Sequence, residues 1–181
     1  MHYYKQALEY DIAGYNRNKT DVSIRDVAVS YMKIGEVLMR IPQFEEAIDY
    51  FDNAIEWYKV GYSNAEQKIG QLNAKKGIAH SLNKKGQIYK ALGLYQMAAD
   101  HFVLSIQNYK ELMEESDDVD YLESYAIVNY YMGVLLFECN MRAEGRKFLQ
   151  TAYDSVLKQN SFAANVRSVE LEKELRRWFS L

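Results

Sequence analysis

The sequence is poor in the residues that build disulfides and tight turns. Its 181 residues include one cysteine, one proline and nine glycines. A single cysteine excludes an internal disulfide framework and fits a reducing compartment. So few glycines and prolines leave little material for the many turns of a β-sandwich or barrel, and long stretches without either residue favour helices. The scarcity of both therefore predicts an all-α fold.

The sequence also lacks the signals of membranes, secretion and nucleic-acid binding. No segment approaches the roughly 18 consecutive apolar residues of a membrane span, and the first residues have no apolar secretory core. The formal net charge is −3, so no global positive field attracts nucleic acid. We therefore predict a cytoplasmic protein that binds neither a membrane nor nucleic acid. A lysine stripe at 75–85 leaves nucleic-acid binding as an alternative.

One spacing of small and apolar residues occurs three times. A glycine is followed after 12 residues by a small residue, after four more by a large apolar one, and after three more by a small one. The copies are Gly35, Ala47, Phe51 and Ala54; Gly86, Ala98, Phe102 and Ser105; and Gly133, Gly145, Leu149 and Ala152. Antiparallel helices lie close together only where their facing side chains are small. Each copy is therefore predicted to be a helix pair, with a turn at Pro42, Gly93 or Asn140.

These residues resemble the tetratricopeptide repeat (TPR) family, in which each repeat is a pair of antiparallel helices. In the first copy, Ile34-Gly35 and Leu38 occupy the family's first-helix positions. The middle copy departs from the pattern at Lys85, where an apolar residue is expected, and the third departs at Asn129 and Arg142. The copies recur after 51 and 47 residues instead of the standard 34. Such elongated pairs are similar to those of the TPR-domain peptide-pheromone receptors of Gram-positive bacteria.

The predicted fold is a right-handed superhelical stack of antiparallel helix pairs, a TPR-like α-solenoid of about eight helices in one domain over residues 1–181. The expected pairs and the C-terminal capping helix lie at 21–60, 64–114, 118–158 and 162–180. The expected N-caps of three helices are Asp21, Asn64 and Asp117 or Asp118.

Residues 1–17 are expected to form a second helix whose first-helix partner is missing. This predicts a fragment of a longer protein. The helix would expose four large residues, Tyr3, Tyr4, Leu8 and Ile12. Because these could pair across a two-fold axis, a homodimer through this helix is a further expectation.

No residue pattern typical of catalysis or metal binding is present. His2, His80 and His101 are too far apart for ligand pairs at i, i+3 or i+4. Cys139 has no neighbouring base and is expected to be a small buried or half-buried residue. The acidic run at 114–120 lacks the glycine and the terminal glutamate of a calcium loop, and no P-loop, dinucleotide fingerprint or nucleophile elbow occurs. We therefore predict no enzyme activity, no catalytic residue, no metal and no cofactor.

The resemblance implies that the first helices line a concave groove that holds a partner. The expected partner-binding residues are Glu36, Lys76, His80, Asn83, Lys84, Gln87, Tyr130 and Tyr131. Amide side chains both donate and accept hydrogen bonds and could grip a peptide backbone, while the tyrosines would form an aromatic wall. We expect a peptide with an acidic or terminal carboxylate near Lys84. The alternative is that the lysines form an ordinary solvated helix face.

The leading functional prediction is a scaffold or adaptor that binds a protein or peptide. The alternative is a regulatory fragment of a bacterial peptide-responsive signalling protein, a phosphatase or a transcription regulator, whose effector domain is absent. TPR adaptors for heat-shock chaperones are disfavoured. Their carboxylate-binding positions are occupied here by Met32, Glu36, Lys84, Ile127 and Tyr131. Only one of these residues is basic.

Overall fold

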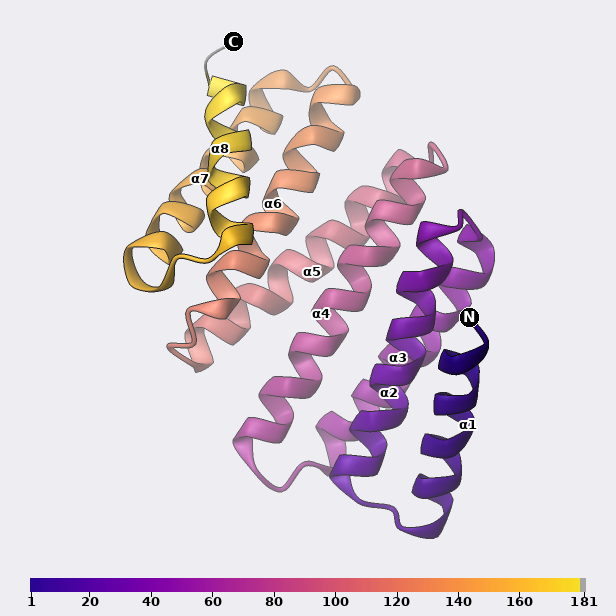
Figure 1. Cartoon of the computed structure of the whole chain (residues 1–181). Coiled ribbons are helices and arrows are strands. Elements are labelled where there is room, and N and C mark those ends of the chain that lie inside the picture. Colours follow the sequence, from indigo (N-terminus) through magenta and orange to yellow (C-terminus); the bar gives the residue numbers. More distant parts are fainter. Residues whose placement is uncertain (180–181) are drawn as a thin grey trace. The chain divides into compact units, whose positions relative to one another are not determined.

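The computed structural model describes residues 1–179, and its regular elements are helices throughout this range (Figure 1). The eight helices are α1 (His2–Arg17), α2 (Asp21–Arg40), α3 (Phe44–Asn64), α4 (Lys68–Ala91), α5 (Tyr95–Glu115), α6 (Asp120–Glu138), α7 (Arg142–Ala163) and α8 (Val166–Phe179). They follow one another as antiparallel pairs. The prediction of an all-α fold with eight helices in sequential pairs is confirmed.

Four predicted helix boundaries are wrong by four or five residues: the ends of α3 and α7 and the starts of α4 and α8. Asn64, expected as an N-cap, is the last residue of α3, because the chain leaves the helix only at Ala65, whose N–H donates to Gly61 O at 3.0 Å. The last helix begins at Val166 instead of residue 162, because α7 continues to Ala163. Ser180, the expected end of that helix, lies outside the described residues.

Side-chain caps explain where α2 and α8 begin. Thr20 is the N-cap of α2 in place of the expected Asp21, and its hydroxyl accepts from Ser23 N at 3.2 Å. Before α8, the carbonyl of the Asn165 side chain accepts from Ser168 N at 2.9 Å, and Ser168 Oγ accepts from Asn165 N at 3.1 Å. Both caps satisfy backbone N–H groups that have no partner within the helix.

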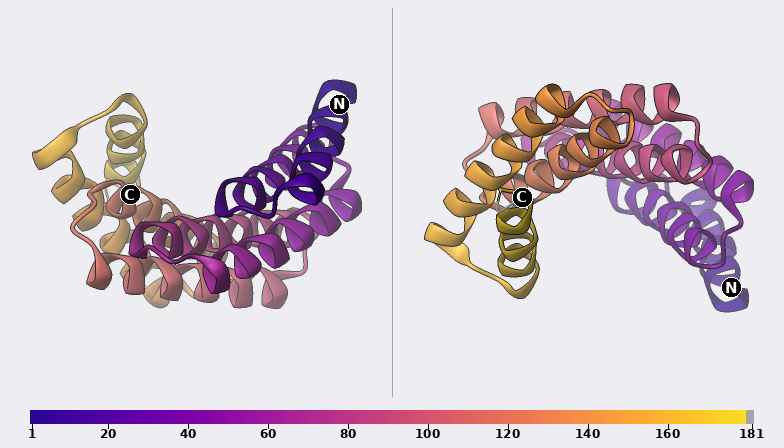
Figure 2. Two further views of the ribbon diagram at one scale, coloured as in Figure 1. Left: turned by 90° about the horizontal axis from the view of Figure 1, so that it is seen from below. Right: turned by 90° about the horizontal axis from the view of Figure 1, so that it is seen from above.

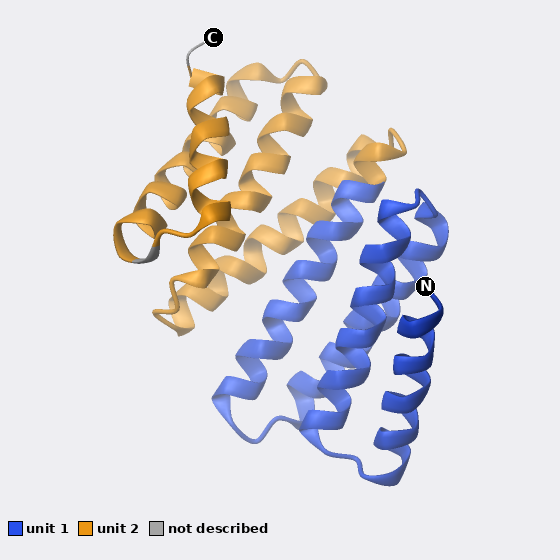
Figure 3. Ribbon diagram, in the orientation of Figure 1, with its two compact units in different colours: residues 1–88 blue, residues 89–181 orange. Residues whose placement is uncertain are grey.

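The chain divides into two compact units, residues 1–88 and residues 89–181, with the boundary inside α4 (Figure 3). Unit 1 contains α1, α2, α3 and most of α4. Within it α1 packs on α2 and α2 packs on α3, and these helices run side by side in the views of Figure 2. Unit 2 contains the end of α4 and α5–α8, with α6 in contact with α5, α7 and α8.

The core of unit 1 joins four helices, with Ile88 of α4 in the same cluster as residues of α1, α2 and α3. Val27, Ile34 and Leu38 of α2 pack with Phe51 of α3 and with Leu8 of α1. Apolar burial of this kind is the main favourable term in folding.

The packing of α1 changes one expectation. Leu8 is buried and Ile12 packs against the same core, so these two residues are not exposed as predicted. Ser30 Oγ also donates to Asp11 Oδ2 at 2.5 Å and ties α1 to α2. The large side chains that α1 leaves exposed include Tyr3 and Tyr10, at 83% and 73%.

An ion pair accommodates the residue that departs from the repeat pattern in α4. The Lys85 side chain is only 9% exposed, and its Nζ lies 2.5 Å from Asp52 Oδ1 of α3. A buried ammonium is tolerated when a carboxylate neutralises it and accepts its hydrogen bond. A lysine can therefore stand where an apolar residue is expected.

In unit 2, α6, α7 and α8 share one core. Ala126 and Ile127 of α6 pack with Leu149 and Ala152 of α7 and with Leu175 of α8. Near the end of α6, Glu138 Oε1 lies 2.7 Å from Lys90 Nζ, the second-last residue of α4. The expected turn residues Gly93 and Asn140 adopt φ of +74° and +61°, a region that glycine and asparagine tolerate best.

Gly35, Gly133 and Gly145 lie where paired helices make close contacts. A Cβ on Gly133 would lie 2.7 Å from Leu149 Cγ and 3.0 Å from Gly145 O, and a Cβ on Gly145 would lie 2.9 Å from Gly133 O. A Cβ on Gly35 would lie 3.0 Å from Phe51 Cζ. Side chains do not normally make such short contacts, so the helices can approach this closely only because these positions are glycine.

Replacing the glycines at the α6–α7 contact is expected to destabilise unit 2. Gly133→Ala or Gly145→Ala forces the two backbones apart, and the free energy of unfolding should fall by about 1–3 kcal/mol in urea titrations. Gly14→Ala is the matched control, because a Cβ there meets nothing within 4 Å. The control should be neutral or more stable by up to about 1 kcal/mol. Equal effects at Gly14 and Gly133 would contradict this account.

Candidate functional site

The residues predicted from the sequence to bind a partner lie in both units. Six are on α2 and α4 in unit 1, and two are on α6 in unit 2. The unit 1 group comprises Glu36, Lys76, His80, Asn83, Lys84 and Gln87. The unit 2 group comprises Tyr130 and Tyr131.

A carboxylate–imidazole contact joins α2 to α4 in the middle of the unit 1 group. Glu36 Oε1 lies 3.0 Å from His80 Nε2, and its other oxygen lies 3.0 Å from Lys33 Nζ. The hydrogen bond from His80, followed by that from Lys33, lowers the pKa of Glu36 from 4.5 to about 2 against the opposing effect of burial. Glu36 therefore remains ionised at neutral pH and holds the two first helices together.

The two amide side chains of α4 bond to each other. Gln87 Nε2 donates to Asn83 Oδ1 at 3.2 Å, and Asn83 is 5% exposed. Gln87 is half-buried and is the more accessible of the two amides. Lys76, His80 and Lys84 are also half-buried. Of the two amide side chains expected to bind a peptide backbone, Gln87 is therefore the one that a peptide can reach more easily.

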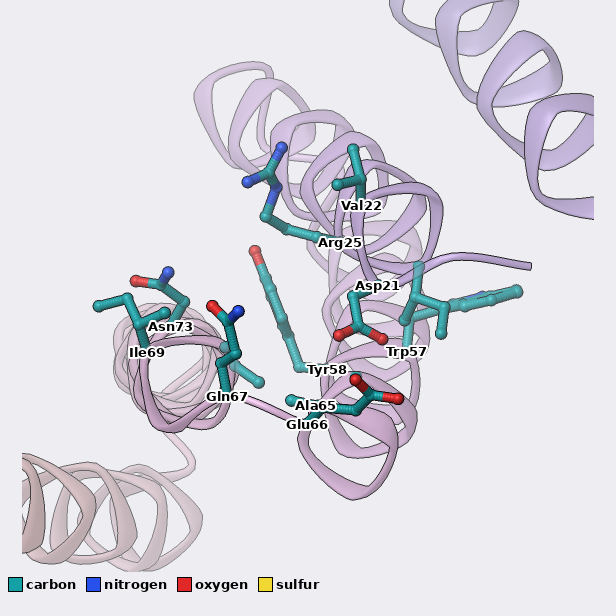
Figure 4. A pocket seen from close by; sticks show the side chains of 14 residues that line it. Asp21, Val22, Arg25, Trp57, Tyr58, Ala65, Glu66, Gln67, Ile69 and Asn73 are labelled. Carbon is teal, nitrogen blue, oxygen red and sulfur yellow. The ribbon is translucent and has the colours of Figure 1, made fainter. Parts of the chain in front are cut away.

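A cleft of about 380 Å³ lies at the N-terminal end of the α2–α4 face. We call it the Tyr58 cleft, after the ring that stands in it between the two helices (Figure 4). Val22 and Arg25 of α2 line one side, and Ile69 and Asn73 of α4 line the other (Figure 4). Burial is the main cause that raises the pKa of the Tyr58 hydroxyl to about 12, so it stays protonated.

Small residues leave the Tyr58 cleft open. Gly61 and Ala65 at the end of α3 and Gly70 and Ala74 at the start of α4 contribute almost no side-chain volume to its lining. The sequence analysis missed this cleft. The sequence feature that could have indicated this cleft is the cluster of small residues at 61–74. This cluster lies outside the three repeated spacings.

A second cleft, of about 240 Å³, lies further along the same two helices. We call it the Lys84 cleft; Glu36, Met39, Arg40 and Lys84 line it. Arg40 adds an exposed cation one helical turn after Glu36. The sequence analysis did not select Arg40, because it falls outside the positions that the resemblance assigns to the groove. The Glu36–His80 contact separates this cleft from the Tyr58 cleft.

The two tyrosines of unit 2 contact other parts of that unit. The Tyr130 hydroxyl donates to Glu174 Oε1 of α8, and the pKa of Tyr130 is raised by burial and then by this carboxylate. The Tyr131 ring is nearly parallel to Phe102, with centroids 6.1 Å apart, and 5.6 Å from the Tyr130 ring. They form an aromatic cluster, but Tyr130 is tied to α8.

Metal-binding and membrane-spanning features are absent from residues 1–179. No group of three or more histidine, cysteine, aspartate or glutamate side chains in this range could hold a metal ion. None of the helices in the described part of the chain combines the length and apolarity required to cross a membrane.

Comparison with known families identifies the repeated helix pairs. Residues 28–60 and 79–111 match the family model of the tetratricopeptide repeat. These two segments, about a third of the chain, are therefore similar to tetratricopeptide repeats. The first match covers most of α2 and α3, and the second covers parts of α4 and α5. The family model does not support the narrower resemblance to peptide-pheromone receptors. TPR domains are in general modules that bind other proteins.

Solved structures with a similar arrangement include two at low sequence identity. The C-terminal TPR-containing domain of a protein described as an FK506-binding protein of Plasmodium falciparum is 16% identical, with a TM-score of 0.48, and the match covers 91% of this chain and 95% of that one. The MamA protein is 14% identical, with a TM-score of 0.34, and the match covers 91% and 96%. No curated protein matches the chain. These values say nothing about function.

The pKa of Glu36 leads to a prediction about stability and pH. Because this pKa is lower in the folded chain than its ordinary value of 4.5, ionised Glu36 stabilises the fold above pH 4.5, and the contribution is lost as the pH falls toward 2. Glu36→Gln should lower the free energy of unfolding by on the order of 2 kcal/mol at pH 7, and the difference should shrink toward pH 2. Urea titrations at a series of pH values measure it.

Glu56→Gln is the control for this experiment. Glu56 is an exposed glutamate of α3 that pairs with Lys59 at 2.7 Å, and an exposed pair of this kind contributes less than about 1 kcal/mol. A pH-independent difference between Glu36→Gln and the wild type would show that Glu36 does not titrate as described.

Proposed function

We propose that this chain is a protein-interaction module that binds an extended segment of a partner protein along the α2–α4 face of unit 1. The observation that carries the proposal is the presence of two clefts on this face, one largely apolar and one with two cations. TPR domains are built to expose helix faces of this kind to partners. The proposal involves no catalytic step.

The chemistry of the two clefts defines what each one accepts. The Tyr58 cleft has an aromatic ring and small apolar residues in its lining, so it suits a leucine, methionine or phenylalanine side chain. In the Lys84 cleft, Lys84 and Arg40 suit a carboxylate, since charge-assisted hydrogen bonds to lysine and arginine are stronger than neutral ones. Gln87 lies one turn from Asn83 on the same helix and offers an amide to the peptide backbone.

The distance between the clefts defines the spacing of the two anchors. Arg25 and Arg40 lie fifteen residues apart on α2, which is roughly 22 Å along a helix. An extended peptide advances about 3.3 Å per residue. The partner segment is therefore expected to carry an apolar and an acidic residue about seven positions apart.

Peptides selected at random test this proposal. A phage library of random 15-residue peptides is selected on the chain, and the enriched peptides are synthesised with a fluorescent label for anisotropy titrations. Enriched sequences should show an apolar and an acidic residue at the proposed spacing. Lys84→Glu places a carboxylate beside the ligand's own, so it should weaken binding roughly tenfold or more.

Lys59→Glu is the matched control, because it makes the same charge change on an exposed lysine of α3 that lines neither cleft. It should leave the affinity within about twofold of wild type. Equal affinities for wild type and Lys84→Glu would show that the α2–α4 face is not where the peptides bind.

A further inference from the structure

A third cleft lies in unit 2, outside the proposed peptide-binding face. It measures about 450 Å³, and we call it the Trp178 cleft; Phe137, Arg142, Ala143, Arg146 and Trp178 line it. It is formed where α6 ends, α7 begins and α8 ends. The α6–α7 turn and the C-terminal end of α8 lie at the same end of unit 2 (Figure 1).

The two arginines of this cleft have no anionic partner among residues 1–179. Both are exposed, and neither guanidinium makes an ion pair or a hydrogen bond in the described part of the chain. Arg142 and Arg146 lie one turn apart at the start of α7, where the helix dipole disfavours positive charge. They do not stabilise α7 through the dipole, and both guanidiniums remain available to an external anion.

Aromatic rings form the other wall of the cleft. The Phe137 and Trp178 rings pack at a centroid distance of 5.0 Å and an interplanar angle of 57°. Both side chains are half-buried, so part of each ring remains accessible. Ala143, between the two arginines on α7, adds no bulk to the lining. The cleft therefore combines two cations with an apolar surface.

We propose that the Trp178 cleft is a second protein-binding site that takes an acidic segment of the form Glu-x-Glu followed by an apolar residue. Side chains one turn apart on a helix are about 6 Å apart. Alternate side chains of an extended peptide lie on one side of the backbone and about 7 Å apart. Two carboxylates at alternate positions can therefore each meet one guanidinium in a bidentate pair, and the following apolar side chain covers Phe137 and Trp178.

The charges around the cleft favour an acidic peptide over a nucleic acid. The chain has a net charge of −3. Glu144 lies between the two arginines in sequence, so a long polyanion would be repelled there. A peptide with two carboxylates can avoid Glu144. The proposal concerns unit 2 and is independent of the α2–α4 face.

Indole signals in NMR spectra test the proposal. The chain has two tryptophans, so a ¹⁵N-labelled sample gives two indole N–H signals, and Trp57→Phe assigns them. The probe is an acetylated, amidated peptide, Glu-Ser-Glu-Leu-Phe, and the matched peptide has Gln in place of each Glu. The acidic peptide should shift the Trp178 signal saturably, and the Gln peptide should bind about tenfold more weakly.

Four variants separate the proposed site from general charge effects and from the α2–α4 face. Arg142→Gln and Arg146→Gln should each weaken binding of the acidic peptide about tenfold. Lys147→Gln is the matched control, because it removes an exposed cation of α7 that does not line the cleft. Lys84→Glu should leave the Trp178 shift unchanged, so failure of one site does not imply failure of the other.

Several results would overturn the proposal. Equal affinity for the Glu and Gln peptides would show that only apolar contact matters. Saturable shifts with inorganic phosphate or oligothymidine, but not with the acidic peptide, would assign the arginines to another anion. An acidic peptide that loses binding in Lys84→Glu and keeps it in Arg146→Gln would bind to unit 1 instead. No shift at 1 mM peptide would also reject the proposed site.

Discussion

Paired helices of this chain approach one another so closely that side chains are excluded from parts of their contact faces. At the α6–α7 contact, a Cβ on Gly133 would lie 2.7 Å from Leu149 Cγ and a Cβ on Gly145 would lie 2.6 Å from Phe137 Cδ2, and each would also crowd the backbone oxygen of the other glycine. At the α2–α3 contact, the Phe51 ring occupies the space beside Gly35. Each helix can lie this close to its partner only without a side chain at these positions. The pairs present their remaining faces to neighbouring helices and to ligands.

Charged residues between helices serve two purposes in unit 1. The Lys85–Asp52 pair neutralises a buried ammonium between α4 and α3, and the Glu36–His80 contact joins α2 to α4. The second contact also divides the α2–α4 face into an apolar cleft and a cationic cleft. The contact that stabilises this face thus also lies between the two clefts. We propose that these clefts bind the apolar and the acidic residue of a partner segment.

Much of the fold could be predicted from the sequence because helix pairing depends on local patterns. The three spaced copies of small and apolar residues predicted the pairs, and the turn residues Gly93 and Asn140 lie where expected. Helix ends were predicted less well, since caps such as Thr20–Ser23 depend on short side-chain contacts that many sequences could make. The predicted exposure of Leu8 was wrong because α1, which was expected to lack a pairing helix, packs on α2, the next helix along the chain.

The helical class, the pairing and the glycine contacts can be read from the chain alone, because each of these follows from residues at fixed offsets. Which polar residues are engaged, and where clefts open, depends on how the helices pack together. Asn83 is buried beside Gln87, Glu36 is held by His80 and Lys33, and the Tyr58 and Trp178 clefts each draw on three helices. Such arrangements depend on side chains from separate helices meeting in space, and no spacing along one helix encodes them.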